Sequence, residues 1–78
     1  MHLEIISPDK ILFKGEVTSV VVPGETGLLE ILNNHAPLIT TLKNENIRVK
    51  ESDGKTASIQ VNDGGVVEVL NNKVTILL

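Results

Sequence analysis

The fold is decided by residues 47–61, which read IRVKESDGKTASIQV. On both sides of the central pair Asp53-Gly54, apolar residues alternate with polar ones. Alternation with a period of two is typical of a strand that turns one face to a core. An Asp-Gly pair accepts the positive φ angles that a tight hairpin turn requires. The stretch therefore predicts a β-hairpin with one buried face.

The same pattern continues outward from this hairpin. Towards the C-terminus, Val67 and Val69 bracket Glu68, and a further strand follows the pair Asn71-Asn72, which predicts a tight turn because Asn tolerates the left-handed region. Towards the N-terminus, strands are predicted over residues 3–6, 11–13, 17–22, 28–32 and 38–42. Within that half, Gly15 predicts a bulge or bend, and Pro23-Gly24 predicts the end of a strand.

Composition supports strands throughout the chain. Val, Ile and Thr supply 24 of the 78 residues, whereas Ala supplies two, and branched residues favour strands over helices. No window of the sequence carries a convincing helical stripe. We therefore expect an all-β protein, a flattened β-sandwich or barrel of about eight to ten short strands without a long helix. Residues 1–78 are expected to form a single domain.

The residue inventory excludes several classes of function. The net charge is −3 and the only aromatic residue is Phe13, so the chain offers neither the basic surface nor the stacking platforms of a nucleic-acid binder. It has no cysteine and only two histidines, His2 and His35. No side chains show the spacing of a metal site, and no motif for a nucleotide or a catalytic nucleophile occurs. We expect no catalytic residue, no metal and no cofactor.

The sequence also contains no signal peptide and no apolar run that is long enough to cross a membrane. Any association with a membrane is therefore expected to go through another protein, without direct insertion.

Several predicted strands carry apolar residues on both faces. Examples are Ile5 with Ile6, Val66 with Val67, and Ile76 with Leu77. A small sandwich covers only one face of each strand. Two interpretations remain open: these residues lie under loops at strand ends, or they form an exposed apolar patch that marks a protein interface.

The roles of two individual residues are also open to alternative interpretations. His35, which precedes Ala-Pro, either hydrogen-bonds backbone carbonyls or makes a polar contact at a subunit interface. Lys10 follows Pro8-Asp9 in a turn, and small all-β lipoyl and biotinyl carrier domains hold a modified lysine in such a turn. A carrier domain and an unrelated small β interaction module are therefore the alternative functions.

The chain resembles a known family over its full length. The resemblance runs through LEIISP at residues 3–8, a PGxxG motif at residues 23–27, HAPLITTLK at residues 35–43 and GGVVEV at residues 64–69. In this order and spacing, these motifs are similar to the N-terminal β-sandwich domain of the epsilon subunit of F-type ATP synthase.

The resemblance implies a non-catalytic subunit of the central stalk, or rotor, that links the gamma subunit to the ring of c subunits. In that place it supports the coupling of ion translocation to ATP synthesis. Its location would be the cytoplasmic face of the bacterial inner membrane, as a peripheral part of the synthase.

The resemblance also implies contact residues. The c-ring contacts would be Glu25, Thr26, Leu28, Leu29, Glu30 and Ile31. The gamma contacts would be Ser7, His35 and Thr40. The chain departs from the family pattern at Glu30, at Asn33-Asn34 and at Asn44-Glu45, where the family has glycine or Pro-Gly. Asn34 can replace a glycine at positive φ at modest cost, whereas Glu30 and Glu45 cannot do so easily.

Many epsilon subunits continue into a C-terminal helical hairpin that inhibits ATP hydrolysis and, in some cases, binds ATP. These 78 residues end directly after the last predicted strand. The resemblance therefore implies no ATP site within them.

Overall fold

The computed structural model describes all residues from Met1 to Leu78 and consists of strands, turns and loops. Its eight strands are β1 (His2–Ser7), β2 (Lys10–Gly24), β3 (Gly27–Leu32), β4 (Leu38–Leu42), β5 (Asn46–Glu51), β6 (Thr56–Gln60), β7 (Gly65–Leu70) and β8 (Lys73–Leu77). The prediction of an all-β protein is confirmed. No helix in the structure has the length and apolar character to cross a membrane.

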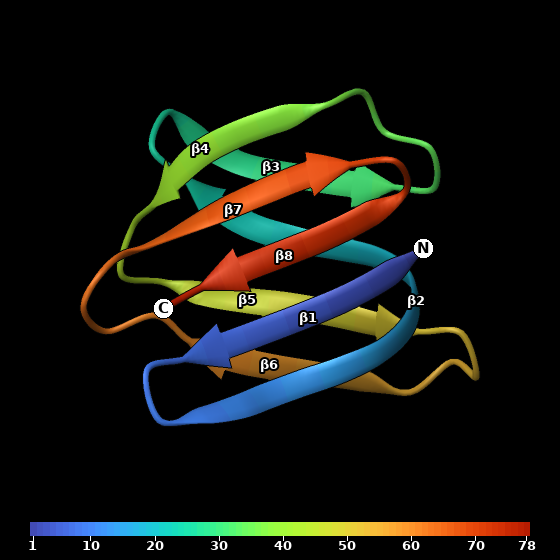
Figure 1. Cartoon of the computed structure of the whole chain (residues 1–78), viewed down its shortest axis with the longest axis horizontal. Helices are drawn as coiled ribbons and strands as arrows, with labels where there is room; N and C mark the ends of the chain where they lie inside the picture. Colours follow the sequence, from blue (N-terminus) through green and yellow to red (C-terminus); the bar gives the residue numbers. More distant parts are fainter.

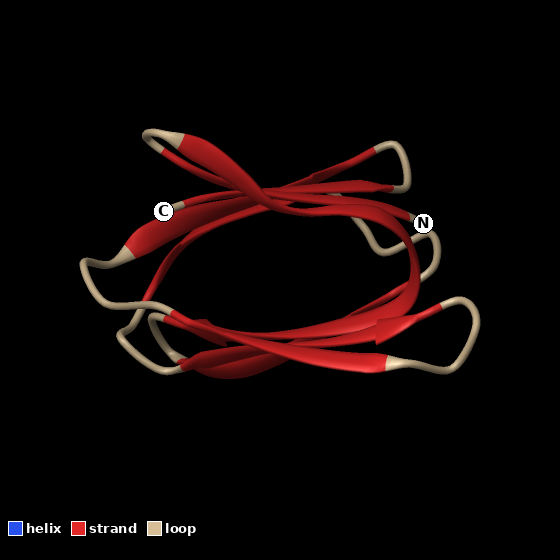
Figure 2. Cartoon of the chain, turned by 90° about the horizontal axis from the view of Figure 1, so that it is seen from below, coloured by secondary structure: helices blue, strands red, loops and turns tan.

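The strands form a sandwich of two layers, which are seen edge-on in Figure 2. Layer A has the strand order β1-β8-β7-β4, and layer B has the order β3-β2-β5-β6. The long strand β2 belongs to both layers, because its first half pairs with β1 and its second half pairs with β3 and β5. Figure 1 shows this strand curving from one layer into the other.

The continuity of β2 corrects two predictions. Residues 11–13 and 17–22 were expected to form separate strands, with a bulge or bend at Gly15. Instead Gly15 pairs regularly with Leu3, and β2 is irregular at two other places, at Leu12 between Ile11 and Phe13 and between Val17 and Ser19. The predicted end at Pro23-Gly24 is confirmed, since β2 ends at Gly24, and the carbonyl of Pro23 accepts a backbone hydrogen bond of 2.7 Å from the amide of Lys43.

The core lies between the layers and is entirely apolar. Fifteen buried side chains form it: Met1, Leu3, Ile5, Val17, Val20, Val22, Ile31, Leu42, Ile47, Val49, Val61, Val67, Val69, Val74 and Ile76. In the hairpin β5–β6, Ile47 and Val49 face inward while Arg48 and Lys50 are exposed, as the alternation predicts. Each fully buried aliphatic side chain contributes about 1.5–3 kcal/mol relative to an exposed one.

The turns also follow the sequence. Asn71 and Asn72 have φ angles of 51° and 58°, and Asn34 has a φ of 61°. The predicted asparagine turn and the predicted replacement of a glycine by Asn34 are therefore confirmed. Glu30 and Glu45 avoid positive φ, and Glu30 lies within β3, so these positions are compatible with glutamate.

Candidate functional site

The first candidate surface is the hairpin between β2 and β3. Its two turn residues, Glu25 and Thr26, are exposed, and they are enclosed by the pair Gly24 and Gly27. Gly27 has a φ of 140°, which L-residues rarely adopt. The hydroxyl of Thr41 on β4 donates a hydrogen bond of 2.7 Å to Oε2 of Glu25. This bond links the hairpin turn to layer A.

The six predicted ring contacts all lie on this hairpin but point in two directions. Glu25, Thr26 and Glu30 are exposed, and Leu28 is 72% exposed. Leu29 is half-buried, because it pairs with the core residue Val22. Ile31 is 0% exposed and pairs with Val20. The side chain of Ile31 therefore holds β3 on the core and faces no solvent.

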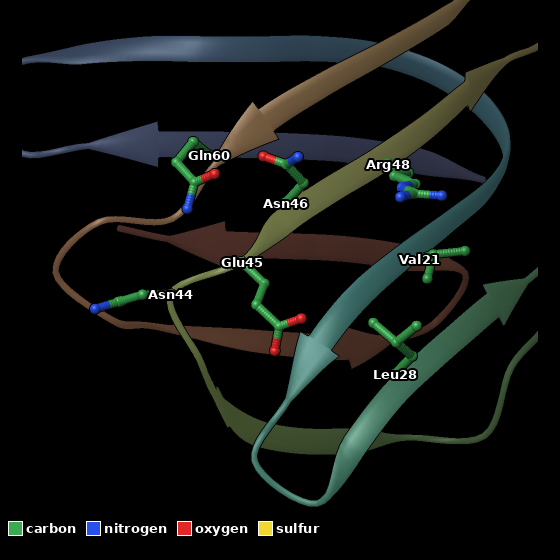
Figure 3. A pocket seen from close by; sticks show the side chains of 7 residues that line it. All are labelled: Val21, Leu28, Asn44, Glu45, Asn46, Arg48 and Gln60. Atoms are coloured by element: carbon green, nitrogen blue, oxygen red, sulfur yellow. The ribbon is translucent and has the colours of Figure 1, made fainter.

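A groove of about 410 Å³ lies beside the hairpin, on the outer face of layer B. Figure 3 shows the seven residues that line it: Val21, Leu28, Asn44, Glu45, Asn46, Arg48 and Gln60. We call it the tip groove. Val21 and Leu28 come from the hairpin, and the other five residues come from the β4–β5 loop and strands β5 and β6. The tip groove is thus a polar hollow with an apolar wall supplied by the hairpin.

The β4–β5 loop is fixed where it forms the groove. Oδ1 of Asn44 accepts a hydrogen bond of 2.7 Å from the amide of Gly64. The carbonyl of Glu45 accepts one of 3.0 Å from the amide of Val61. Both bonds connect the loop to the segment between β6 and β7, so the groove is held from two sides.

The three predicted gamma contacts are not brought together as one cluster. Ser7 ends β1, and its hydroxyl donates to the carbonyl of Lys10 at the start of β2. His35 lies in the β3–β4 loop, at the opposite end of the sandwich (Figure 1). Thr40 lies on β4 and is half-buried, because it alternates with the exposed Ile39 and Thr41. Only His35 and Thr40 belong to the same corner of the molecule.

His35 makes the bond that its first interpretation predicted. Its Nδ1 lies 2.8 Å from the carbonyl oxygen of Ala36, and its backbone amide donates to the carbonyl of Leu32. The ring thus stabilises the loop ahead of Pro37. Its alternative role, a contact at a subunit interface, stays a prediction.

The outer face of layer A carries exposed apolar side chains at two corners. The first, which we call the β1 corner, is a row formed by register: Val66 pairs with Leu77, Leu77 with Ile6, and Ile6 with Ile11. Ile11 and Leu77 are 59% and 52% exposed. The row crosses three neighbouring strand pairs. Of the two interpretations of strands that are apolar on both faces, an exposed apolar patch therefore applies here.

The second corner, which we call the β4 corner, contains Pro37, Ile39 and Leu70. They line a shallow groove of about 400 Å³ together with Leu38, Glu68 and Val69, and Ile39 is 70% exposed. Sequence reasoning did not select Ile39, although the alternation of β4 separates it from its inward neighbours Leu38 and Thr40. That period-two signal could have identified it.

A charged band lies on the same outer face, where β1 pairs with β2 and β8. His2 lies 2.9 Å from Oε2 of Glu16 and 3.3 Å from Oε1 of Glu4, while Lys14 and Lys73 also approach Glu4. The hydrogen bond from His2, with smaller contributions from the two lysines, lowers the pKa of Glu4 below its ordinary value of 4.5. The band is internally compensated, which leaves the two corners as the apolar parts of this face.

No three His, Cys, Asp or Glu side chains come together as a metal site. Lys10, the lysine of the carrier alternative, is exposed at the start of β2.

Comparison with known proteins decides the family. The family model of the β-sandwich domain of the ATP synthase delta/epsilon chain matches residues 1–78. The chain belongs to this family. The resemblance read from the sequence is thereby confirmed, and the carrier alternative is not favoured.

The relatives support this assignment. The chain is 45% identical over 75 residues to the ATP synthase epsilon chain of Chlorobium limicola and covers 84% of that protein. It is 50% identical over 74 residues to the epsilon chain of Dichelobacter nodosus, of which it covers 50%, and 47% identical to that of Leptospira borgpetersenii, of which it covers 59%. The chain therefore spans about half the length of some epsilon-chain relatives and most of others.

Solved structures share the fold. A chain in the mitochondrial ATP synthase of Euglena gracilis, in a structure of its OSCP, F1 and c-ring, matches with a TM-score of 0.88 and 22% identity over 96% of this chain and 48% of its own length. A chain in the central stalk and c-ring structure of Tetrahymena thermophila mitochondrial ATP synthase matches with a TM-score of 0.79 and 19% identity, over 99% of this chain and 61% of its own length.

Proposed function

We propose that the chain acts as a non-catalytic subunit of the central stalk of an ATP synthase, where it joins the gamma subunit to the c-ring. The observation that carries this proposal is the epsilon-type family match over the whole chain, together with two structurally distinct outer faces. In a bacterial cell, such a subunit would lie at the cytoplasmic face of the inner membrane, bound through its partners.

The gamma subunit is assigned to the outer face of layer A. Exposed apolar patches on small proteins usually mark protein interfaces, and this face has two of them, the β1 corner and the β4 corner. Ser7 adjoins the first corner, and His35 and Thr40 adjoin the second. A partner that covers the face from corner to corner would thus reach Ser7 and His35, whereas Thr40 points inward from β4 and would contribute by positioning that strand.

The c-ring is assigned to the β2–β3 hairpin. Glu25, Thr26, Leu28 and Glu30 offer exposed side chains there, and Leu29 is partly accessible. Ile31 contributes indirectly, because its buried side chain fixes the strand that carries the others. A joint between two rotating parts must transmit torque without slipping, and a sandwich whose core is fully apolar provides a rigid base for the hairpin.

Co-purification tests this proposal. The chain and a tagged cognate gamma subunit are expected to form a stoichiometric complex at micromolar concentration. That complex should then bind the detergent-solubilised c-ring. Absence of any complex with gamma at micromolar concentration would contradict the proposed function.

A further inference from the structure

We propose that the tip groove is a receptor for a carboxylate on a polar loop of the c-ring, and that Arg48 is the residue that binds it. This inference rests on the proposed function and extends it, because it adds a second contact surface beside the hairpin. The group that this second surface would bind is a carboxylate.

The first observation is that Arg48 has no partner within the chain. The ion pairs of the structure involve Lys14, Lys55, Lys73, His2 and the terminal ammonium, but not Arg48. Arg48 is exposed on β5, between Val21 of β2 and Ser58 of β6 in the register. A guanidinium group presents a rigid fork of donors that matches a carboxylate in a bidentate way.

The second observation is the surroundings of Arg48. The groove also contains three carboxamide side chains, Asn44, Asn46 and Gln60, which donate and accept hydrogen bonds. Asn44 is already oriented by the amide of Gly64, and Gln60 donates to the carbonyl of Val61 at 2.9 Å. Such a lining suits a polar main chain and a charged side chain better than an apolar segment.

The third observation is continuity with the hairpin. Leu28, the most exposed of the large apolar residues, is both a predicted ring contact and a wall of the groove. Figure 3 shows Glu45 reaching from the β4–β5 loop towards β2, on the side of the groove away from Arg48. A loop that meets Leu28 can therefore place a carboxylate at Arg48, while Glu45 is left to accept N–H donors of the same loop.

Lys50 provides a matched control for Arg48. It lies two residues along β5 on the same outer face, it is exposed and it has no ion pair, but it does not line the groove. Arg48→Glu and Lys50→Glu therefore change the net charge equally, and only the first reverses the charge inside the groove.

The experiment measures the dissociation constant between the complex of this chain with gamma and the solubilised c-ring. Arg48→Glu is expected to weaken binding about tenfold or more, and Lys50→Glu by about twofold or less. Replacing the acidic residue of the ring loop by its amide should abolish the difference between wild type and Arg48→Gln. Thermal unfolding of both variants should match wild type.

Other outcomes would overturn the inference in distinguishable ways. Equal effects of the two charge reversals would remove the groove from the contact while leaving the proposed function intact. Binding to ring-free vesicles of anionic lipid that depends on Arg48 would assign the residue to lipid phosphate instead of a carboxylate. Failure of the wild-type complex to bind the ring at all would contradict the proposed function, and this inference with it.

Discussion

The outer faces of the two layers differ in what they leave exposed. Layer A carries two apolar corners and a compensated charged band, whereas layer B carries a polar groove with an unpaired arginine beside the hairpin. The strands of both layers bury their inward side chains in one shared core, so the requirements of the core do not explain the difference between the outer faces. It lies in the outward residues, which the core does not constrain, and it suits two partners of different chemistry.

The largest expected effect is a difference in the free energy of unfolding between a buried and an exposed residue of the same strand. Ile76 is fully buried and its neighbour Leu77 is exposed. Ile76→Ala should lower the free energy of unfolding by about 2–5 kcal/mol, because it opens a cavity. Leu77→Ala should change it by only about 0.5 kcal/mol or less. Urea denaturation of both variants checks this, and equal losses would show that the β1 corner is part of the core.

The next effect concerns gamma binding by the β1 corner. Leu77→Asp places a charge in the centre of the apolar row and should weaken gamma binding by roughly tenfold or more, since charged groups are depleted from interface centres. Ser58→Asp, on the outer face of layer B, serves as the control and should leave gamma binding unchanged. Isothermal titration with gamma measures both, and a loss of affinity in the control alone would reverse the assignment of the faces.

The β4 corner should show a similar but smaller effect. Ile39→Asp is expected to weaken gamma binding by roughly fivefold to tenfold, because this corner holds fewer apolar residues than the β1 corner. The fold should be retained, since Ile39 is exposed. Unaltered affinity for gamma in this variant would confine the gamma contact to the β1 corner.

A change in the hairpin should affect only the ring. Leu28→Asp is expected to weaken binding of the c-ring while leaving both the fold and gamma binding intact. Measurement of ATP-driven ion pumping in a reconstituted synthase reports the coupling directly. Wild-type coupling in this variant would remove the hairpin from the ring contact.

The smallest expected effect is a dependence of stability on pH in the charged band. The pKa of Glu4 is lowered in the folded chain, so its contribution is fully present above its ordinary pKa of 4.5 and is lost as the pH falls through the lower folded-state value. Glu4→Gln should therefore destabilise the chain at pH 7 more than at acidic pH. Urea midpoints at several pH values test this, and a constant difference would contradict it.

The sequence predicted the fold well where alternation and turn chemistry agree. The hairpin of β5 and β6 and the turn at Asn71-Asn72 were visible as local patterns, and the positive φ of Asn34 was expected from the family resemblance. The continuity of β2 was not visible, because Gly15 normally interrupts a strand. Here the pairing of Gly15 with Leu3 overrides that local preference.

The candidate sites were predicted less completely. The hairpin was identified through the family resemblance, but the direction of each side chain was not, so buried Ile31 was grouped with exposed Leu28. The tip groove combines residues from β2, β3, β5, β6 and a loop. Arg48 and Gln60 belong to the predicted hairpin, but they meet Val21 and Leu28 only because β5 pairs with β2, and no local pattern in the sequence encodes that pairing.

The most direct test of the account uses the methyl groups of the chain. Selectively labelled Ile, Leu and Val methyls are followed by NMR as the gamma subunit is added. Shifts are expected at the half-buried Ile6 and at the exposed residues of layer A, namely Ile11, Ile39, Val66, Leu70 and Leu77, with little change at Val21, Leu28 and Leu32 of layer B. Shifts confined to Val21, Leu28 and Leu32 would contradict it.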